Sequence, residues 1–525
     1  MKPKSFCTMC TKRYKEELVC LLLTLSLHHK DEIIYILCDK ETKDYIKSIS
    51  PKPRLKIKWY ATLTRYSLLK RTDMEKMGIW CDFQLNKMDI IKHAIETCGD
   101  TLFLDSDMIV LDEINDVEEN KELGLSPQYL NNEIMNEKGY YSGGMVWCNN
   151  IKIIEDWKFF TGNSRYYDQA ALDDVYEVHE KVTFKFGKNY NFQENRFSSG
   201  IETKEELINS IVVKNKKIMY NDKPLKNIHL RFNGELDNVR QLFLLRLKEA
   251  NLYRELLCIF RLINEKWIIC LPINKEKKQG FRELSFLLNK NKDLKVEFMD
   301  GTKHCWLQPD ILIYDKPTLE WCNSEVATAS LVLLGNCSIK VEGKQLKELG
   351  MNVKEMNFWS QHPIILERFE KTNKNIENRE TNVLYIGNLN VIPNKKENNN
   401  WSSIIDKHID NEKLDCKTCL EDIANSKYAF CVNNNFTKSM MMMDMMALGT
   451  VPIVTKNVNV ESYVSKLKEG EHYVSAITSK QLKKKLKGID NEKWREMSES
   501  CKTWYKKNIH SENYWNVLIN DILYS

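Results

Sequence analysis

Short apolar runs alternate with amphipathic segments along the first 115 residues of the chain. In the segment 86–97, Met88, Ile91 and Ile95 have the spacing of one helix face. Strands that alternate with helices indicate a parallel sheet covered on both faces, in which ligands bind beyond the carboxyl ends of the strands. The predicted strands are 6–10, 32–39, 55–60 and a run from 102 onward, and the predicted helices are 16–28, 40–48 and 86–97.

The alternation of strand and helix patterns resumes in the second half of the chain. The segment 370–380 is polar and rich in Asn and Lys, which predicts a linker, and a further αβ unit opens at 382–388. A chain of 525 residues fits two to four domains of roughly 150 residues each. We therefore predict an α/β protein with domains at 1–250, 255–375 and 376–525. Strands are predicted at 266–272, 294–299, 310–314 and 330–334, and a helix at 280–288.

Charge and hydropathy limit the classes of partner. The 78 basic and 73 acidic residues give a net charge of +5, and the two signs are interleaved along the chain. Interleaved charges of this kind argue against a nucleic-acid partner. The apolar run 20–25 is too short to cross a bilayer, so we predict no transmembrane segment.

The 16 cysteines are scattered, and many lie in apolar stretches, as buried reduced thiols do. Without a secretory signal, this usage predicts a reducing compartment and hence a cytoplasmic protein. The pairs Cys7/Cys10 and Cys416/Cys419 have the spacing of half a zinc site. They fall in different predicted domains with no second pair nearby, which disfavours structural zinc.

Two carboxylates interrupt the apolar run 102–112. Asp105 and Asp107 follow a buried strand, and residues two apart on a strand point to the same side. Two carboxylates that converge beside an apolar strand are costly unless a cation neutralises them, and a divalent metal ion is a natural partner. The alternative is an ordinary Asx-type turn at the end of the strand.

Three further patterns carry candidate chemistry. The stretch 139–147 places glycines in a turn before an apolar strand, which permits a ligand to approach the backbone closely; a plain hairpin turn explains it equally well. Asp168 opens a helix together with Gln169, and taken alone it is best explained as a helix cap. His229 lies in the strand-like run 227–232, where a lone histidine is more often structural than a ligand.

Taken in order over residues 5–240, these patterns resemble the GT-A glycosyltransferases of the glycogenin-like group. Asp105-Ser106-Asp107 is similar to the DxD motif of that group. The other matching elements are Lys87 before that motif, Ser142-Gly143-Gly144, Asp168-Gln169 and His229 after it. The family often carries a Gly and a Lys-Pro-Trp segment after its histidine, whereas this chain has 231–234 with the sequence RFNG. Ser142 stands where the family usually has Asn.

The resemblance implies a role for each matching residue. It implies metal ligands at Asp105, Asp107 and His229, acceptor contacts at Ser142, Gly143 and Gly144, and a catalytic carboxylate at Asp168. It implies donor contacts at Thr8, Tyr14, Lys87, Asp105, Ser106 and Arg231.

The resemblance implies transfer of a hexosyl or deoxyhexosyl group from a nucleotide-sugar, UDP-linked, onto a glycan or glycoprotein. A metal ion would accept oxygen ligands from carboxylates and phosphates, and a histidine ligand favours Mn²⁺ over Mg²⁺. Lys87 would offset phosphate charge. Asp168 would be a general base in an inverting enzyme, or would stabilise an oxocarbenium-like state in a retaining one, and the sequence leaves both open.

The second half resembles a different glycosyltransferase type. Residues 425–515 are similar to the C-terminal half of GT-B or exostosin-like enzymes, which implies two Rossmann-like subdomains and a donor contact at Lys438. The methionines 440–443 occupy much of the region that holds the nucleotide-sugar in that group, and methionine supplies neither charge nor directional hydrogen bonds. Either this module binds its donor differently, or it is not catalytic. The methionine run is also explained by a buried helix face.

A GT-A module followed by a GT-B-like module resembles the multi-domain glycosyltransferases of large DNA viruses of algae and protists. Those enzymes modify capsid glycans in the cytoplasm, so the resemblance implies a cytoplasmic or virion-associated enzyme. One alternative is a carbohydrate-binding or scaffold protein with degenerate transferase folds. Another is a nucleotidyltransferase or phosphohydrolase, which also uses paired Asp residues, but the sequence shows no phosphate-cradling Gly-rich loop.

Overall fold

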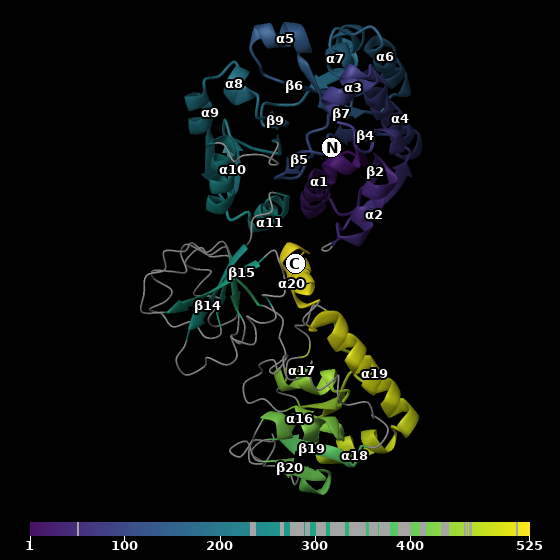
Figure 1. Cartoon of the computed structure of the whole chain (residues 1–525), viewed down its shortest axis with the longest axis vertical. Helices are drawn as coiled ribbons and strands as arrows, with labels where there is room; N and C mark the ends of the chain where they lie inside the picture. The colour runs from purple at the N-terminus through teal and green to yellow at the C-terminus, as the bar shows by residue number, and fades with distance from the viewer. Residues whose placement is uncertain are drawn as a thin grey trace. The chain divides into compact units, whose positions relative to one another are not determined.

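The structure is a computed structural model of the 525-residue chain, and its described residues form two compact units. The first unit is Met1–Glu265 with Tyr524, and the second is Lys266–Leu523 with Ser525. Figure 1 shows the first unit in purple to teal. The domain boundaries proposed from the sequence stay predictions. The structure describes residues 1–49, 52–230, 238–262, 267–273, 288, 294–300, 311–314, 331–334, 353–355, 366, 379–386, 401–409, 416–431, 440–455, 458, 460, 465–510 and 513–524.

The first unit is built on a seven-stranded mixed sheet in the order β3-β2-β1-β4-β7-β6-β8. The strands from β3 to β4 run parallel, which confirms the expected parallel sheet in this part of the chain. β7 is antiparallel to both β4 and β6, and β6 is parallel to β8. The strands are β1 (Ser5–Cys10), β2 (Ile33–Cys38), β3 (Lys56–Ala61), β4 (Thr101–Leu104), β6 (Leu123–Pro127), β7 (Tyr141–Cys148) and β8 (Thr183–Lys185).

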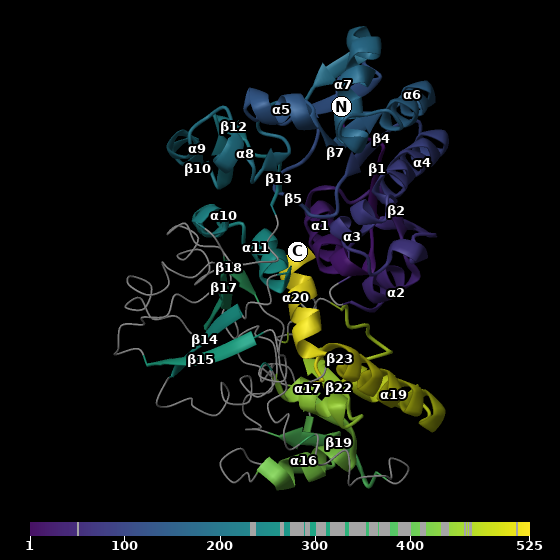
Figure 2. The same cartoon turned by 45° about the horizontal axis from the view of Figure 1, so that its top comes forward.

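Helices cover this sheet. α4, α6 and α7 pack against one another and against β1, β4 and β7, as Figure 2 shows, and an apolar core fills the space between them. α1 is buried over most of its length and packs against β5, α2 and α11. The helices are α1 (Lys15–His28), α2 (Lys40–Ser48), α3 (Arg71–Lys76), α4 (Trp80–Cys98), α5 (Asn132–Lys138), α6 (Ile151–Thr161), α7 (Tyr167–His179), α8 (Arg196–Ser199), α9 (Lys204–Ser210), α10 (Asn238–Glu249) and α11 (Tyr253–Leu262).

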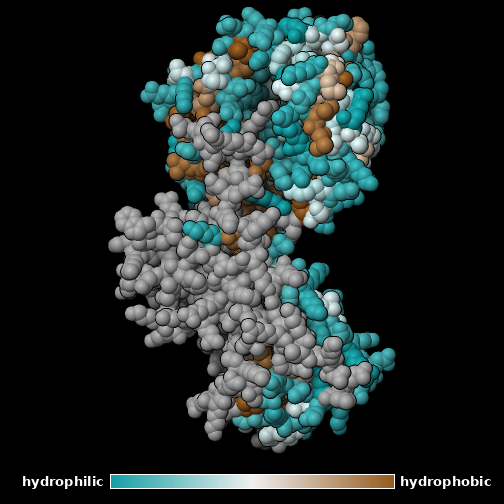
Figure 3. Space-filling model, viewed as in Figure 1, coloured by the Kyte–Doolittle hydropathy of each residue, from teal (hydrophilic) through white to brown (hydrophobic). Residues whose placement is uncertain are grey.

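Two small sheets complete the described part of the first unit. β5 (Met108–Val110), β13 (Asn227–His229) and β9 (Phe192–Gln193) form one, with β13 in the centre. β10 (Ile211–Lys214), β11 (Lys217–Tyr220) and β12 (Lys223–Pro224) form an antiparallel meander. On the face of the first unit seen in Figure 3, hydrophobic side chains lie in small groups separated by hydrophilic ones.

The described residues of the second unit form two five-stranded sheets, both parallel throughout. The first has the order β15-β14-β16-β17-β18, and the second β20-β19-β21-β22-β23. Their strands are β14 (Trp267–Ile273), β15 (Leu294–Asp300), β16 (Ile311–Tyr314), β17 (Leu331–Leu334), β18 (Val353–Glu355), β19 (Thr381–Ile386), β20 (Lys407–Ile409), β21 (Ser426–Cys431), β22 (Val451–Thr455) and β23 (Val474–Ala476). The helices are α16 (Cys416–Ala424), α17 (Met440–Ala447), α18 (Ser479–Lys487), α19 (Asn491–Asn508) and α20 (Tyr514–Tyr524).

The methionine run lies in α17. Met442, Met443, Met445 and Met446 are completely buried in the core around β19, β21 and β22. This packing agrees with the interpretation of the run as a buried helix face. Among the described residues, no helix is long and apolar enough to cross a membrane.

Candidate active site

The acidic pair lies where the chain passes from one sheet to another. β4 ends at Leu104 and pairs with β7, whereas β5 begins at Met108 and pairs with β13. The amide of Met108 donates to the carbonyl of Asp105 at 3.2 Å, and the amide of Asp105 donates to the carbonyl of Gly144 at 2.8 Å. Backbone hydrogen bonds therefore close a turn at Asp105. Because the two carboxylates take no part in these bonds, a turn at this position is compatible with a metal site.

Asp105, Asp107 and His229 form a group that could hold a metal ion. One ligand atom from each lies within 4.8 Å of the others, and no other such group of three occurs among the described residues. His229 Nε2 is 2.9 Å from Asp107 Oδ1 and 4.0 Å from Asp105 Oδ2. Two carboxylates and one imidazole make a donor set that suits a divalent cation.

The other nitrogen of the His229 ring has a partner. Nδ1 lies 3.1 Å from Oδ1 of Asn191, a completely buried residue in the left-handed conformation with φ +46°. An amide oxygen accepts a hydrogen bond, so this contact calls for a proton on Nδ1, and Nε2, which faces the carboxylates, is the nitrogen that would bind a metal ion. This is the arrangement that a metal-binding histidine needs.

Lys87 brings a buried positive charge to the same place from α4. Its Nζ donates to Asp168 Oδ2 at 2.7 Å and to the carbonyl of Gly143 at 2.9 Å, and it lies 3.7 Å from Asp105 Oδ1. Burial lowers the pKa of Lys87, but the charges of Asp105 and Asp168 outweigh it, so the pKa is raised above its ordinary value. Burial raises the pKa of Asp105, against the lowering effect of Lys87 and His229.

Asp168 is placed by the first turn of α7. Tyr167 before it has φ +48°, and the indole of Trp157 donates to the carbonyl of Asp168 at 2.7 Å. The N-cap of α7 is Tyr166, which makes no side-chain cap bond. The interpretation of Asp168 as a helix cap is therefore wrong: its carboxylate pairs with Lys87.

Gly143 and Gly144 let the carboxylates approach the strand. Both lie inside β7, so the predicted turn is confined to Gly139, which has φ +98° and precedes the strand, and is wrong for these two glycines; antiparallel pairing with β4 makes them part of the sheet. A methyl group on Gly143 would lie 2.5 Å from Asp168 Oδ2, and one on Gly144 would lie 2.6 Å from Asp105 Oδ2. Any larger residue at either position would displace a carboxylate.

These groups line one cleft of about 550 Å³. Part of its wall is aromatic and basic: the Arg71 guanidinium lies 5.2 Å from the ring centre of Trp80 and donates to the Tyr166 hydroxyl at 2.7 Å. The Trp80 and Tyr167 rings meet edge to face at 6.4 Å. Because Tyr167 precedes Asp168, this aromatic wall adjoins the buried ion pair.

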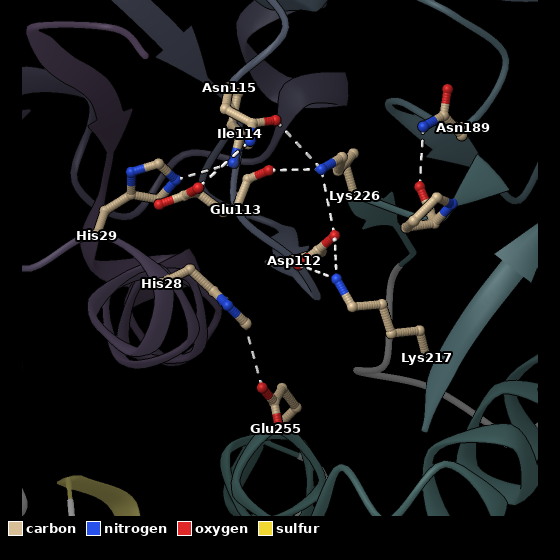
Figure 4. Close-up of polar contacts among 11 residues, drawn as sticks. His28, His29, Asp112, Glu113, Ile114, Asn115, Asn189, Lys217, Lys226 and Glu255 are labelled. Carbon is tan, nitrogen blue, oxygen red and sulfur yellow. Dashed lines mark hydrogen bonds and ion pairs between the residues drawn. The ribbon is translucent and has the colours of Figure 1, made fainter. Parts of the chain in front are cut away.

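A buried lysine holds β5 to β13, the strands next to the acidic pair and His229. Lys226 Nζ donates to the carbonyl of Glu113 at 2.8 Å and lies 3.2 Å from Asp112 Oδ2, as Figure 4 shows. The carbonyl of Lys226 accepts from the amide of Leu111 at 2.8 Å. These contacts fix the register that places His229 opposite Met108.

Comparisons with known proteins gave weak likenesses. No family model matches the sequence, and no curated protein matches it. Similar solved structures include the galactosyltransferase LgtC in complex with donor and acceptor sugar analogs, at 13% identity and TM-score 0.31, covering 43% of this chain and 86% of that one. The glycosyltransferase GlyE of Streptococcus pneumoniae TIGR4 has 11% identity and TM-score 0.33, covering 93% and 98%. Mouse xyloside xylosyltransferase 1 has 10% identity and TM-score 0.29, covering 43% and 97%. Scores this low do not establish a family.

The structure brings most of the predicted site residues together. Thr8 is an exception: it is completely buried within β1 and is not part of the cleft lining, which begins at Met9. Its position inside the sheet disfavours a donor contact. Arg231 and Lys438 lie outside the described residues. The predicted residues that line the cleft are Tyr14, Lys87, Asp105, Ser106, Asp107, Ser142, Gly143, Gly144, Asp168 and His229.

Sequence reasoning missed several residues that support the site. Asn191 is one, since nothing near it in the sequence points to His229. Gln193 is another: it lines the cleft, and its Nε2 donates to Ser142 Oγ at 2.9 Å. In the sequence, Trp80 and Tyr166 are marked only by being aromatic, and aromatic residues are common in protein cores.

Proposed function

We propose that the first unit is a metal-dependent GT-A-type glycosyltransferase that moves a sugar from a UDP-linked donor onto a glycan or glycoprotein. The proposal is carried by one observation. A single cleft holds the metal-binding group of Asp105, Asp107 and His229 beside the buried ion pair of Lys87 and Asp168.

The residues present fit a metal ion. Asp105, Asp107 and His229 would hold Mn²⁺ or Mg²⁺, and the imidazole favours Mn²⁺. When bound, such an ion supplies Lewis-acid chemistry that neutralises a departing nucleoside diphosphate. Lys87 adds a fixed positive charge to the same cleft, and its raised pKa keeps it protonated at neutral pH.

Asp168 is the proposed catalytic carboxylate. Lys87 holds it in one orientation, and the carbonyl contact with Trp157 fixes the backbone that carries it. It would serve as a general base toward an acceptor hydroxyl, or would stabilise positive charge at the anomeric carbon. The stereochemistry of the product decides between these roles.

The acceptor is proposed to contact Ser142, Gly143 and Gly144 and to stack on the aromatic wall. Aromatic rings offer the apolar faces on which sugar rings pack. Donor contacts are proposed at Tyr14, Lys87, Asp105 and Ser106, and Arg231 stays a prediction. The cytoplasmic location, the viral capsid acceptor and a second active module also stay predictions.

Thermal denaturation of the full chain tests the proposal. We expect UDP with Mn²⁺ to raise the unfolding temperature, because a ligand at 100 times its Kd stabilises the folded state by about 2.7 kcal/mol. Asp107→Ala should remove the response. Asp89→Ala, which removes an exposed carboxylate of α4 paired with Lys158, should keep it.

The panel of UDP, GDP and CMP, each with Mn²⁺ or EDTA, separates the alternatives. A response to UDP that needs Mn²⁺ supports the transferase. No response to any nucleotide in the wild-type chain contradicts it and favours the carbohydrate-binding or scaffold alternative.

A further inference from the structure

A buried arginine contacts the backbone of Asn191, the residue whose side chain contacts His229. Arg196, the first residue of α8, is 1% exposed. We propose that Arg196 is a positioning residue that fixes Asn191 and, through Asn191, the imidazole of His229. This inference rests on the proposed metal site.

The guanidinium of Arg196 ties together two separate loops. Nη1 donates to the carbonyl of Lys188 at 2.8 Å, and Nε donates to the carbonyl of Gln128 at 3.2 Å. Nη2 donates to the carbonyls of Tyr190 and Asn191, each at 3.4 Å. One side chain therefore holds Asn191 and the residues just before it to the loop at Gln128.

Aromatic rings enclose the same guanidinium. Its carbon lies 4.7 Å from the ring centre of Tyr129 and 4.9 Å from that of Phe192. Burial lowers the pKa of Arg196 to about 10, so the group stays charged at neutral pH. A buried cation is costly unless its donors are satisfied, and here carbonyl oxygens accept from all three nitrogens.

The backbone that Arg196 holds is strained. Asn191 has φ +46° and Tyr129 has φ +57°, a region that residues other than Gly, Asn and Asp rarely adopt, so the unusual conformation is that of Tyr129. Such conformations persist where the surroundings over-determine them. Asn191 then presents Oδ1 to His229 Nδ1 at 3.1 Å, while its amide donates to Asn227 Oδ1 at 3.0 Å.

The test measures Mn²⁺ affinity by isothermal titration calorimetry, with the unfolding temperature of each full-length variant. Arg196→Lys keeps the charge but loses the planar fork. We expect Mn²⁺ binding about tenfold weaker, as is typical when a partner of a metal-binding histidine is disturbed. Asn191→Gly suits a positive φ and removes only the amide, and it should weaken Mn²⁺ binding similarly.

The double variant tests the route of action. If Arg196 acts through Asn191, Arg196→Lys should weaken Mn²⁺ binding no further in the Asn191→Gly background. Arg379→Lys is the matched control, because Arg379 also donates to backbone carbonyls, of Ser426 and Leu448, but belongs to the second unit. It should leave Mn²⁺ affinity unchanged.

Three results would overturn the inference. If the Arg196→Lys variant folds with a lower unfolding temperature but binds Mn²⁺ with wild-type affinity, the role of Arg196 is purely structural. If Arg196→Lys does not fold, wild-type affinity in Asn191→Gly would remove the proposed route. Absence of Mn²⁺ binding in the wild-type chain would reject the proposed metal site together with the inference.

Discussion

Lys87 and Asp168 form a buried ion pair beside the metal-binding group. Burying two charges costs several kcal/mol per ion, and such a pair is often no more stabilising than an apolar pair of the same size. Lys87 lies close to Asp105 as well, so one lysine orients two carboxylates of the cleft. This arrangement is better explained by a role in the chemistry of the cleft than by a contribution to the stability of the fold.

Asp168→Asn tests this role. The substitution keeps the size of the side chain and removes its charge, so we expect turnover to fall by about 10²–10⁴-fold. Donor affinity should be largely kept, because the metal-binding group is intact. Steady-state kinetics and calorimetric binding of UDP with Mn²⁺ measure the two effects separately.

Glu177→Gln is the control for Asp168→Asn, since it removes an exposed carboxylate from the same helix. It should leave both quantities unchanged. Loss of donor binding in Asp168→Asn, rather than loss of turnover, would make Asp168 a structural residue.

At the scale of elements, the sheet β5-β13-β9 carries His229 and Gln193 of the cleft. The pattern of apolar runs predicts the break after Leu104, because two aspartates interrupt the run. It does not predict that β5 leaves the main sheet to pair with β13, since 116 residues lie between the partner residues Val110 and Asn227. Local patterns identify strands, whereas antiparallel pairing such as that of β7 depends on contacts distant in the sequence.

The charge of Asp112 makes the stability of the structure around this sheet depend on pH. Burial raises the pKa of Asp112, but hydrogen bonds and charge from Lys217 and Lys226 outweigh it and hold the pKa below its usual value of 3.8. A lowered pKa contributes stability above pH 3.8 that is lost as pH falls through the folded-state pKa. Asp112→Asn should therefore cost about 1–3 kcal/mol at neutral pH.

The difference in unfolding free energy between wild type and Asp112→Asn should shrink as the pH falls from about 4 to below the folded-state pKa of Asp112. Urea denaturation at several pH values measures it. A difference that stays constant over this range would show that the ionised carboxylate contributes nothing.

At the scale of the molecule, every described residue that lines the cleft belongs to the first unit. The alternation of strands and helices predicts parallel sheets in the second half, and the structure has two. Whether the second half is catalytic could not be predicted from the sequence. The methionine run fills a core, and Lys438 lies outside the described residues.

The Arg379→Lys substitution tests whether the two units unfold in separate transitions. The Arg379 guanidinium donates to the carbonyl of Leu448 at 2.7 Å and to Thr450 Oγ1 at 2.8 Å, so its loss should destabilise the second unit by about 1–3 kcal/mol. Since the cleft lies in the first unit, UDP with Mn²⁺ should stabilise a different calorimetric transition from the one that Arg379→Lys lowers. If both changes move the same transition, the units unfold together, and the cleft depends on the integrity of the whole chain.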